Sequence, residues 1–179
     1  MSKCAVCRTE YKKLRMTQKV CGAIDCAIEQ GRRDQIKRQR AADRQMRNRI
    51  RECREAQKTR AQWLREAQAA FNAWIRARDA NQPCISCGRH HQGQYHAGHY
   101  RSVGAMPALR FCEDNVHKQC APCNNHKSGN VVEYRIGLVK RIGLARVEWL
   151  EGPHDLVKYS IEDAKRIRDE YRQKLKEAA

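Results

Sequence analysis

Apolar residues are sparse over a long stretch in the first half of the chain. Residues 27–80 contain no proline and a single glycine, Gly31, and are rich in Ala, Arg, Gln and Glu. Because these are strong helix formers, we expect a long helix, either unbroken or interrupted. It would span roughly 80 Å if unbroken, at ~1.5 Å per residue. The apolar residues form no sustained heptad, so the pattern does not support a strong coiled coil.

The end of this stretch has a clear amphipathic pattern. Seven apolar residues recur there at helical spacing: Trp63, Leu64, Ala67, Ala70, Phe71, Trp74 and Ile75. The pattern predicts a helix whose apolar face packs on the module that follows, or on a second copy of the chain. We expect this helix to end near Asn81, because Pro83 disfavours helical geometry in the residue before it.

The last third of the chain predicts two further helices. Residues 131–143 have a helical pattern, and residues 144–152 are expected to form a short connection before a Gly-Pro pair breaks the chain. Ser160 is a candidate N-cap for a final helix that runs toward Lys176, with acidic residues in its first turn.

The charge of the chain indicates what it binds. The net charge is +17, and the segment from Gly31 to Arg65 carries 13 Lys and Arg against 4 Asp and Glu. Such a surface attracts densely charged anions, so nucleic acid is the expected partner. The basic segment is either a solvated spacer between two modules or a helix that lies along phosphates. An anionic membrane is disfavoured, because the chain has no long apolar run and its basic stretches lack a matching apolar face.

The ten cysteines indicate metal binding. The first ten residues lack the apolar segment of a signal peptide, so we expect a cytoplasmic protein, in which disulfides are disfavoured. Eight of the cysteines form four close pairs: Cys4/Cys7, Cys21/Cys26, Cys84/Cys87 and Cys120/Cys123. Two pairs together suit one tetrahedral Zn²⁺, which predicts two structural zinc sites. The alternative for the N-terminal site is a helix cap with incidental cysteines. Cys53 and Cys112 are expected to be ordinary buried or half-buried thiols.

The second pair of cysteine pairs has the signature of zinc knuckles. Gly88 follows the first CxxC directly and allows the tight turn that a knuckle makes. The expected fold class is therefore mainly α, with small zinc-stapled α+β modules. Along the chain we expect an N-terminal Cys4 zinc module at 1–26, a long basic helix or linker at 27–80, a zinc-stapled domain at 81–145 and a C-terminal helical segment at 146–179.

The residues between the last two CxxC pairs add a more specific pattern. His96 and His99 lie after the first of these pairs, Asn115 lies five residues before the second, and Asn124 follows the second directly. At His99, Asn115 and Asn124 the chain resembles the HNH, or ββα-metal, nucleases. The resemblance implies a treble-clef or ββα-metal fold, a histidine at the end of the first strand, and polar residues around one divalent cation.

The chain also resembles the phage lambda NinG (Rap) recombination endonuclease family. This resemblance rests on the run AGHYRS…LRF…EDNVHKQCAPCN…SGN…YRIGL, together with the N-terminal cysteine cluster and the basic middle segment. It implies a phage-encoded, structure-selective DNA endonuclease that acts on branched intermediates such as D-loops and Holliday junctions. Branch selectivity comes from the resemblance alone, because no residue spacing shows it.

The chemistry of these residue types agrees with a nuclease. A neutral imidazole suits the role of general base, so His99 is expected to take a proton from the attacking water. We expect Asn115 to orient the imidazole through a hydrogen bond. Mg²⁺ or Mn²⁺ would bind the scissile phosphate and stabilise the leaving oxyanion, with Asn124 as an oxygen ligand.

One position departs from the commoner HNH pattern. Many HNH nucleases carry a metal ligand directly before the general base, where this chain has Gly98. In the NinG-like pattern the candidate ligand lies three residues before the base, which is His96 here. Imidazole is a softer ligand and suits Mn²⁺, Ni²⁺ or Zn²⁺ better than Mg²⁺. The alternative is that His96 supports the ligands without touching the metal.

Five basic residues near the site are candidates for clamping DNA phosphates: Arg101, Arg110, Lys118, His126 and Lys127. A merely solvated charge is the alternative for each of them. His117 and His126 are candidates for contact with phosphate or metal, whereas His90 and His91 are expected to be exposed loop residues.

The sequence leaves three functions open. A metal-dependent DNA endonuclease accounts for the charge, the paired cysteines and the trio of His99, Asn115 and Asn124. A non-catalytic zinc-finger protein that binds nucleic acid accounts for the charge and the cysteines but not for the trio. RNA as the target is compatible with the charge, although no aromatic stacking motif favours it. A homodimer would suit symmetrical cutting of a junction.

Overall fold

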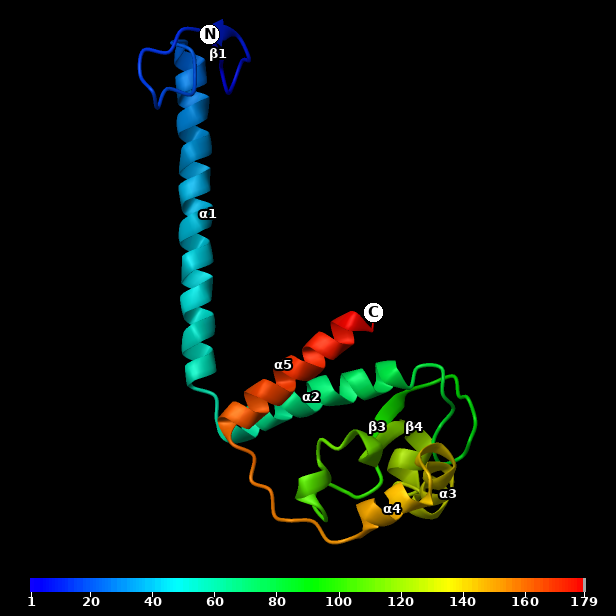
Figure 1. The fold of residues 1–179 in the computed structure, drawn as a ribbon. Helices are drawn as coiled ribbons and strands as arrows, with labels where there is room; N and C mark the ends of the chain where they lie inside the picture. Colours follow the sequence, from blue (N-terminus) through cyan, green and yellow to red (C-terminus); the bar gives the residue numbers. More distant parts are fainter. Residues whose placement is uncertain (179) are drawn as a thin grey trace. The chain divides into compact units, whose positions relative to one another are not determined.

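A computed structural model describes residues 1–178 of the chain (Figure 1). It divides into two compact units, the first from Met1 to Lys58 and the second beginning at Thr59. The described residues are mainly helical and include two small antiparallel sheets of two strands each. The mainly helical class with small α+β modules is confirmed at this level. None of the described helices is both long and apolar enough to cross a membrane.

The first unit is a small N-terminal loop module followed by one long helix. Strand β1 (Ser2–Lys3) pairs with β2 (Glu10–Tyr11). Helix α1 then runs from Ile24 to Ala56, and its N-cap residue, Ala23, provides no side-chain hydrogen bond to the first turn. Nearly all of α1 is exposed, and Cys26 is its buried residue.

The expected helix over residues 27–80 is interrupted, and its two parts belong to different units. The break lies at residues 57–59, because Thr59 starts a new helix, α2 (Arg60–Arg78). The Thr59 hydroxyl accepts the backbone N–H of Gln62 at 3.3 Å, and the Gln62 side chain accepts the N–H of Thr59 at 2.7 Å. This reciprocal capping box favours a helix start at Thr59 over continuation of α1. Helix α2 ends at Arg78, three residues before the expected end at Asn81.

The amphipathic face of α2 is buried, as the sequence predicts. Helix α2 lies beside α5 (Ile161–Glu177) in the second unit (Figure 1). Trp63, Ala67, Phe71 and Ile75 share one core cluster with Ile167 and Tyr171 of α5. Ser160 caps α5, as expected, and forms a capping box with Asp163. The final helix therefore packs on α2, which lies about 100 residues earlier in the chain.

A β-hairpin lies in the same unit. Strand β3 (Tyr95–His99) pairs antiparallel with β4 (Val116–Cys120), and His99 at the end of β3 lies opposite Val116 at the start of β4. The connection between the strands contains two short 3₁₀ turns, η1 (Pro107–Leu109) and η2 (Glu113–Asn115). After β4 come a π-helical turn, η3 (Pro122–His126), and helix α3 (Val131–Ile142).

Residues 144–152 were predicted to be a connection, and this is wrong. Helix α4 (Leu144–Glu151) forms there, and it buries Val147 and Leu150 against Leu138 of α3 in a second core cluster. Gly143 separates α3 from α4 with a φ of 83°, a conformation that favours glycine. A helix of eight residues is hard to recognise from periodicity alone, and tertiary burial decides it.

This second core makes a testable difference between two leucines. Leu138 is fully buried and Leu156 is 91% exposed. We expect Leu138→Ala to lower the free energy of unfolding by about 2–5 kcal/mol. Leu156→Ala should change it by less than about 0.5 kcal/mol. Chemical denaturation of the zinc-loaded protein measures both values, and equal costs for the two substitutions would contradict the described core.

Candidate functional site

Four cysteines come together in the second unit. The Sγ atoms of Cys84, Cys87, Cys120 and Cys123 all lie within 4.8 Å of one another. The first two lie in a tight turn before β3, Cys120 ends β4, and Cys123 lies on η3. Gly88 has a φ of 66°, and its N–H donates to the Cys84 carbonyl at 2.9 Å. The tight turn expected after the first CxxC is therefore present, and four converging sulfurs suit one structural Zn²⁺.

A similar cluster forms in the first unit. The Sγ atoms of Cys4, Cys7, Cys21 and Cys26 also lie within 4.8 Å of one another. Arg8 takes the place that Gly88 has in the other cluster, with a φ of 67° and an N–H bond of 3.1 Å to the Cys4 carbonyl. The fourth cysteine belongs to the first turn of α1, so this cluster is more than a helix cap with incidental thiols.

The sulfurs of each cluster lie close enough to shift one another's pKa, downward for Cys4 and Cys84 and upward for Cys26 and Cys120. The neighbouring Cys7 thiol, together with burial, raises the pKa of Cys26 to about 12. Burial raises the pKa of the Cys120 thiol to about 12, and the nearby Cys123 and Cys84 sulfurs raise it too. Four sulfurs this close repel one another when ionised, so a cluster of thiolates needs a cation at its centre.

The candidate general base, His99, is held in a defined tautomer. Its ring Nε2 lies 3.1 Å from the Arg110 carbonyl oxygen. Because a carbonyl only accepts hydrogen bonds, Nε2 carries the proton and Nδ1 keeps its lone pair. Burial, together with the positive charge of Arg110, lowers the pKa of His99 below its usual value, although the backbone carbonyls of Arg110 and Ala97 favour the charged ring. His99 is therefore a neutral imidazole with one basic nitrogen at neutral pH.

Asn115 does not orient the His99 ring by a direct hydrogen bond, so this expectation is wrong. Its buried side chain accepts the Arg101 N–H at 2.8 Å and donates to the Arg101 and Leu109 carbonyls at 3.0 and 3.1 Å. These bonds tie together the connection between β3 and β4, which also carries Arg110. Asn115 therefore acts on His99 through the backbone that supplies the Arg110 carbonyl.

His96 and His99 point to opposite faces of the hairpin. Side chains alternate along a strand, so His96 shares a face with Gly98, and the register adds their partners Gln119 and His117 to that face. On this face the His96 Nε2, the His117 Nδ1 and the Gln119 Oε1 are buried without a hydrogen-bond partner. These three atoms are a set of unpaired donors or acceptors that a bound ion or water would satisfy.

The structure explains why no ligand lies at position 98. A Cβ atom on Gly98 would lie 2.2 Å from the Gln119 Oε1. Gln119 is held in place, because its amide donates to the Ser86 hydroxyl at 2.7 Å and to the Gly129 carbonyl at 2.6 Å. His96 is the residue of β3 on the same face that has a metal-ligating side chain.

Asn124 lies on η3, as expected just after the second CxxC. Its amide donates to the Asn125 side chain at 2.7 Å, and its Oδ1 accepts no hydrogen bond from the described residues. Groups of three or more His, Cys, Asp or Glu ligand atoms occur in residues 1–178 at the two cysteine clusters alone. His96 is thus not part of such a group. A divalent-ion site at His96 would need further ligands of another type, such as the amide oxygen of Asn124.

The predicted phosphate clamps differ in their availability. Lys118 is buried and its Nζ donates to the Ala80 carbonyl at 2.7 Å, so its prediction as a DNA contact is wrong. Arg110 is half-buried and donates to the Gln68 side chain at 2.9 Å. Arg101 is half-buried, with its Nε buried and unpaired. His126 and Lys127 are exposed and remain available to phosphates.

Three other histidines and the two cysteines outside the clusters lie in different environments. His117 is buried, so a phosphate cannot reach it. Burial also lowers the pKa of His117 to about 3, so its ring is neutral at pH 7. His90 is exposed, as expected, but His91 is half-buried with its Nε2 3.1 Å from the Cys87 Sγ. The spacing of four residues from a zinc-binding cysteine is the signal that could have found this contact. Cys112 is half-buried, as expected, whereas Cys53 is exposed because it lies on the solvated helix α1.

Sequence reasoning also missed a buried carboxylate. Asp79, directly after α2, accepts the Arg78 guanidinium at 2.8 Å and the backbone N–H of Lys118 at 2.9 Å. Burial raises the pKa of this carboxyl, but Arg78 and the Lys118 N–H outweigh it and lower the pKa below its usual value. Asp79 is therefore a charged link between the end of α2 and strand β4.

Comparison with known proteins decides the family. Residues 1–179 match the family described as Bacteriophage Lambda NinG protein. The chain belongs to the NinG family. Two curated relatives, Protein ninG of Salmonella phage P22 and Protein ninG of Escherichia phage lambda, are each 49% identical over 122 residues. Protein ninG of Escherichia phage 933W is 47% identical over the same length.

These matches cover 68% of this NinG family chain and about 60% of the first relatives' length. No solved structure matches the chain. The relatives' names state no activity, so the nuclease interpretation of this NinG chain depends on the site itself.

The two cysteine clusters predict the metal content of this NinG chain. We expect about two tightly bound zinc ions per chain. The double variant Cys21→Ser with Cys26→Ser should bind about one zinc ion per chain, because only the cluster in the first unit loses ligands. Cys53→Ser should still bind two, because Cys53 belongs to neither cluster. Elemental analysis of protein purified without chelator gives the ratio. A wild-type ratio near one would refute the N-terminal site.

Proposed function

We propose that this NinG family chain is a metal-dependent DNA endonuclease. It would cut branched recombination intermediates such as D-loops and Holliday junctions by hydrolysing phosphodiester bonds. The observation that carries the proposal is the state of His99, whose Nε2–H is fixed on the Arg110 carbonyl. Its Nδ1 lone pair can take the proton of an attacking water, and its lowered pKa keeps it neutral at pH 7.

The hairpin supports the position that this role requires. His99 is the last residue of β3, next to the connection that Asn115 ties down through three hydrogen bonds. The Tyr100 N–H also donates to the Asn115 carbonyl at 2.8 Å, directly after His99. The His99 ring is held by the Arg110 carbonyl, and the backbone after it is held by the Asn115 carbonyl. A base fixed in this way loses little conformational entropy when the substrate binds.

The donor set on the neighbouring elements fits a divalent ion. His96 offers a buried nitrogen without a partner, and Asn124 offers an amide oxygen. These two residues would hold the ion. His96 lies on the face of β3 opposite to His99, so the scissile phosphate would have to reach both faces at the end of this strand. His117 and Gln119 offer further unpaired atoms on the His96 face. When bound, Mg²⁺ or Mn²⁺ would bind the scissile phosphate and stabilise the leaving oxyanion. The imidazole of His96 favours Mn²⁺ over Mg²⁺.

DNA as the substrate is supported by charge and by the family. The net charge of +17 favours a polyanion, and the exposed His126 and Lys127 lie next to Asn124. Branch selectivity follows from the resemblance to recombination endonucleases of the NinG (Rap) type. Cutting of two opposed strands in a junction would suit a homodimer.

The competing function is a non-catalytic zinc-finger protein that binds nucleic acid. One observation favours this alternative. Among the described residues, His96 does not belong to any group of three or more His, Cys, Asp or Glu ligand atoms. The two functions differ in whether a bound junction is cut.

A nicking assay on four substrates tests the proposal. A four-way junction, a D-loop, a linear duplex and a single strand are incubated with protein, with and without Mn²⁺. We expect wild-type protein to cut the branched substrates in preference to the duplex, and only with the metal. His99→Ala should lower the rate by ~10²–10⁴-fold, because general-base catalysis is lost, without weakening DNA binding.

His90→Ala is the matched control for this experiment. His90 is exposed in the loop before β3 and has no role in the proposed site, so the variant should cut at the wild-type rate. Near wild-type cutting by His99→Ala would refute the general base. Junction binding without cutting by the wild-type protein, in any divalent metal, would favour the zinc-finger alternative.

The pH profile gives a second test of His99. The neutral imidazole is the active form, and burial lowers the pKa of His99 below 6.5. At saturating Mn²⁺ we therefore expect kcat/KM to be level near pH 7 and to fall only as the pH drops through the lowered pKa. An acid limb centred above pH 6.5 would contradict a half-buried neutral base.

A further inference from the structure

Helix α1 carries a continuous line of cations. Basic residues occur at alternating intervals of four and three residues without a gap, at Arg33, Lys37, Arg40, Arg44, Arg47, Arg51 and Arg54. We call these seven residues the basic stripe. Since residues three and four apart are neighbours on a helix, the stripe lies along one face of α1. It covers about 31 Å at ~1.5 Å per residue.

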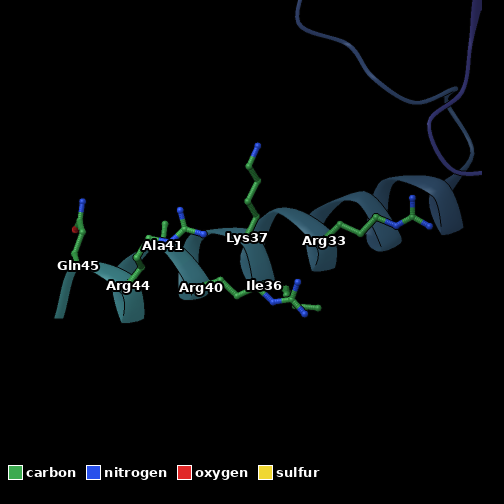
Figure 2. A pocket seen from close by; sticks show the side chains of 7 residues that line it. All are labelled: Arg33, Ile36, Lys37, Arg40, Ala41, Arg44 and Gln45. Atoms are coloured by element: carbon green, nitrogen blue, oxygen red, sulfur yellow. The ribbon is translucent and has the colours of Figure 1, made fainter. Parts of the chain in front are cut away.

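The stripe is free to bind a partner. All seven residues are exposed. The Arg33 side chain pairs with Glu29 at 2.7 Å and donates to the Ala5 carbonyl at 3.2 Å. The side chains of the other six form no hydrogen bond or ion pair with any described residue. Two shallow depressions follow the same face of the helix. Figure 2 shows the first, which includes Arg33, Lys37, Arg40 and Arg44, and the second includes Arg47, Arg51 and Arg54.

The placement of charge is one-sided along this face. The acidic residues between Arg33 and Arg54 are Asp34, Asp43 and Glu52, and none of them takes a stripe position. Asp34 and Asp43 flank the stripe, three or four residues from Lys37, Arg40 and Arg47. Their carboxylates accept hydrogen bonds from Gln30 and Gln39. Like charges three or four residues apart destabilise a helix. A helix that only spaced two modules would be more stable with acidic residues at some of these positions, so the uniform stripe has an unfavourable effect that a bound polyanion would reverse.

We infer that the basic stripe of α1 is a docking surface for the phosphates of double-stranded DNA. The inference extends the proposed function and rests on it for the identity of the polyanion as DNA. A straight line of cations suits a stiff duplex with regularly spaced phosphates. Proteins that hold single strands add aromatic side chains for base stacking, and α1 contains no Phe, Trp or Tyr. It also lacks the Trp, Phe and Leu with which surface helices enter a membrane.

Two pairs of arginines on α1 allow a matched test. Arg44→Gln with Arg47→Gln removes two charges from the stripe. Arg38→Gln with Arg49→Gln removes two charges from the other side of the same helix. All four side chains are exposed and form no hydrogen bond or ion pair with the described residues, so both variants lose the same charge without losing a side-chain contact. Circular dichroism of the full-length variants checks that helix content is unchanged.

The measurement is the salt dependence of duplex binding, without added divalent metal. A fluorescent duplex of about 25 base pairs is longer than the stripe, at ~3.4 Å per pair. Each phosphate contact contributes about 0.9 to the slope of log K against log salt concentration. We expect the Arg44/Arg47 variant to lower this slope by about 2 in magnitude and the Arg38/Arg49 variant to leave it near the wild-type value.

Several results would overturn the inference. These are an unchanged slope in the Arg44/Arg47 variant, an equal fall in the Arg38/Arg49 variant, or tighter and stripe-dependent binding of an RNA duplex of the same length. The result is independent of cutting, because the assay measures binding alone. A protein that binds through the stripe but never cuts a junction would refute the endonuclease and keep the docking surface. His99-dependent cutting with no slope difference would do the reverse.

Discussion

The close approach of four sulfur atoms in each unit is the constraint on which the rest of the structure depends. In the second unit, Cys84 and Cys87 before β3 meet Cys120, the last residue of β4, and Cys123 on η3, so the cluster joins the segments that enter and leave the hairpin. In the first unit the cluster includes Cys26, in the first turn of α1. Ala23 gives that turn no side-chain cap. Negatively charged sulfurs near the start of α1 would complement the helix dipole there.

Two buried polar side chains, Asp79 and Asn115, form hydrogen bonds around the hairpin that holds the cysteines and the candidate base. Asp79 connects Arg78 to strand β4 through the Lys118 N–H, and Asn115 binds the connection that follows β3. Each of these groups is costly to bury unless it is fully bonded. The bonds from Asp79 to Lys118 and from Arg101 to Asn115 span 39 and 14 residues. They tie the end of α2 to β4 and the residues after β3 to the start of β4.

Much of this arrangement can be predicted from local sequence. The paired cysteines, the apolar face of α2 and the Ser160 cap follow from spacing and residue type, and the structure confirms that each cysteine set converges. The break before α2 was also readable, since Thr59 and Gln62 form a capping box. The partners of Asn115 and Lys118 were not, because their backbone acceptors lie far along the chain and no pattern in the sequence marks them. Helix α4 was missed for a related reason, since it forms where Val147 and Leu150 meet α3.

The contact between Gly98 and Gln119 has a consequence for how this site varies. The Gln119 oxygen occupies the space that any side chain at position 98 would need. An acidic ligand at position 98 would displace the Gln119 amide from its bonds to Ser86 and Gly129, so it is better accommodated with a smaller residue at position 119. The two positions, on neighbouring strands, are expected to change together among relatives. Relatives would then have either a ligand at position 98 with a small residue at 119, or glycine at 98 with a long residue at 119 and the ligand at position 96.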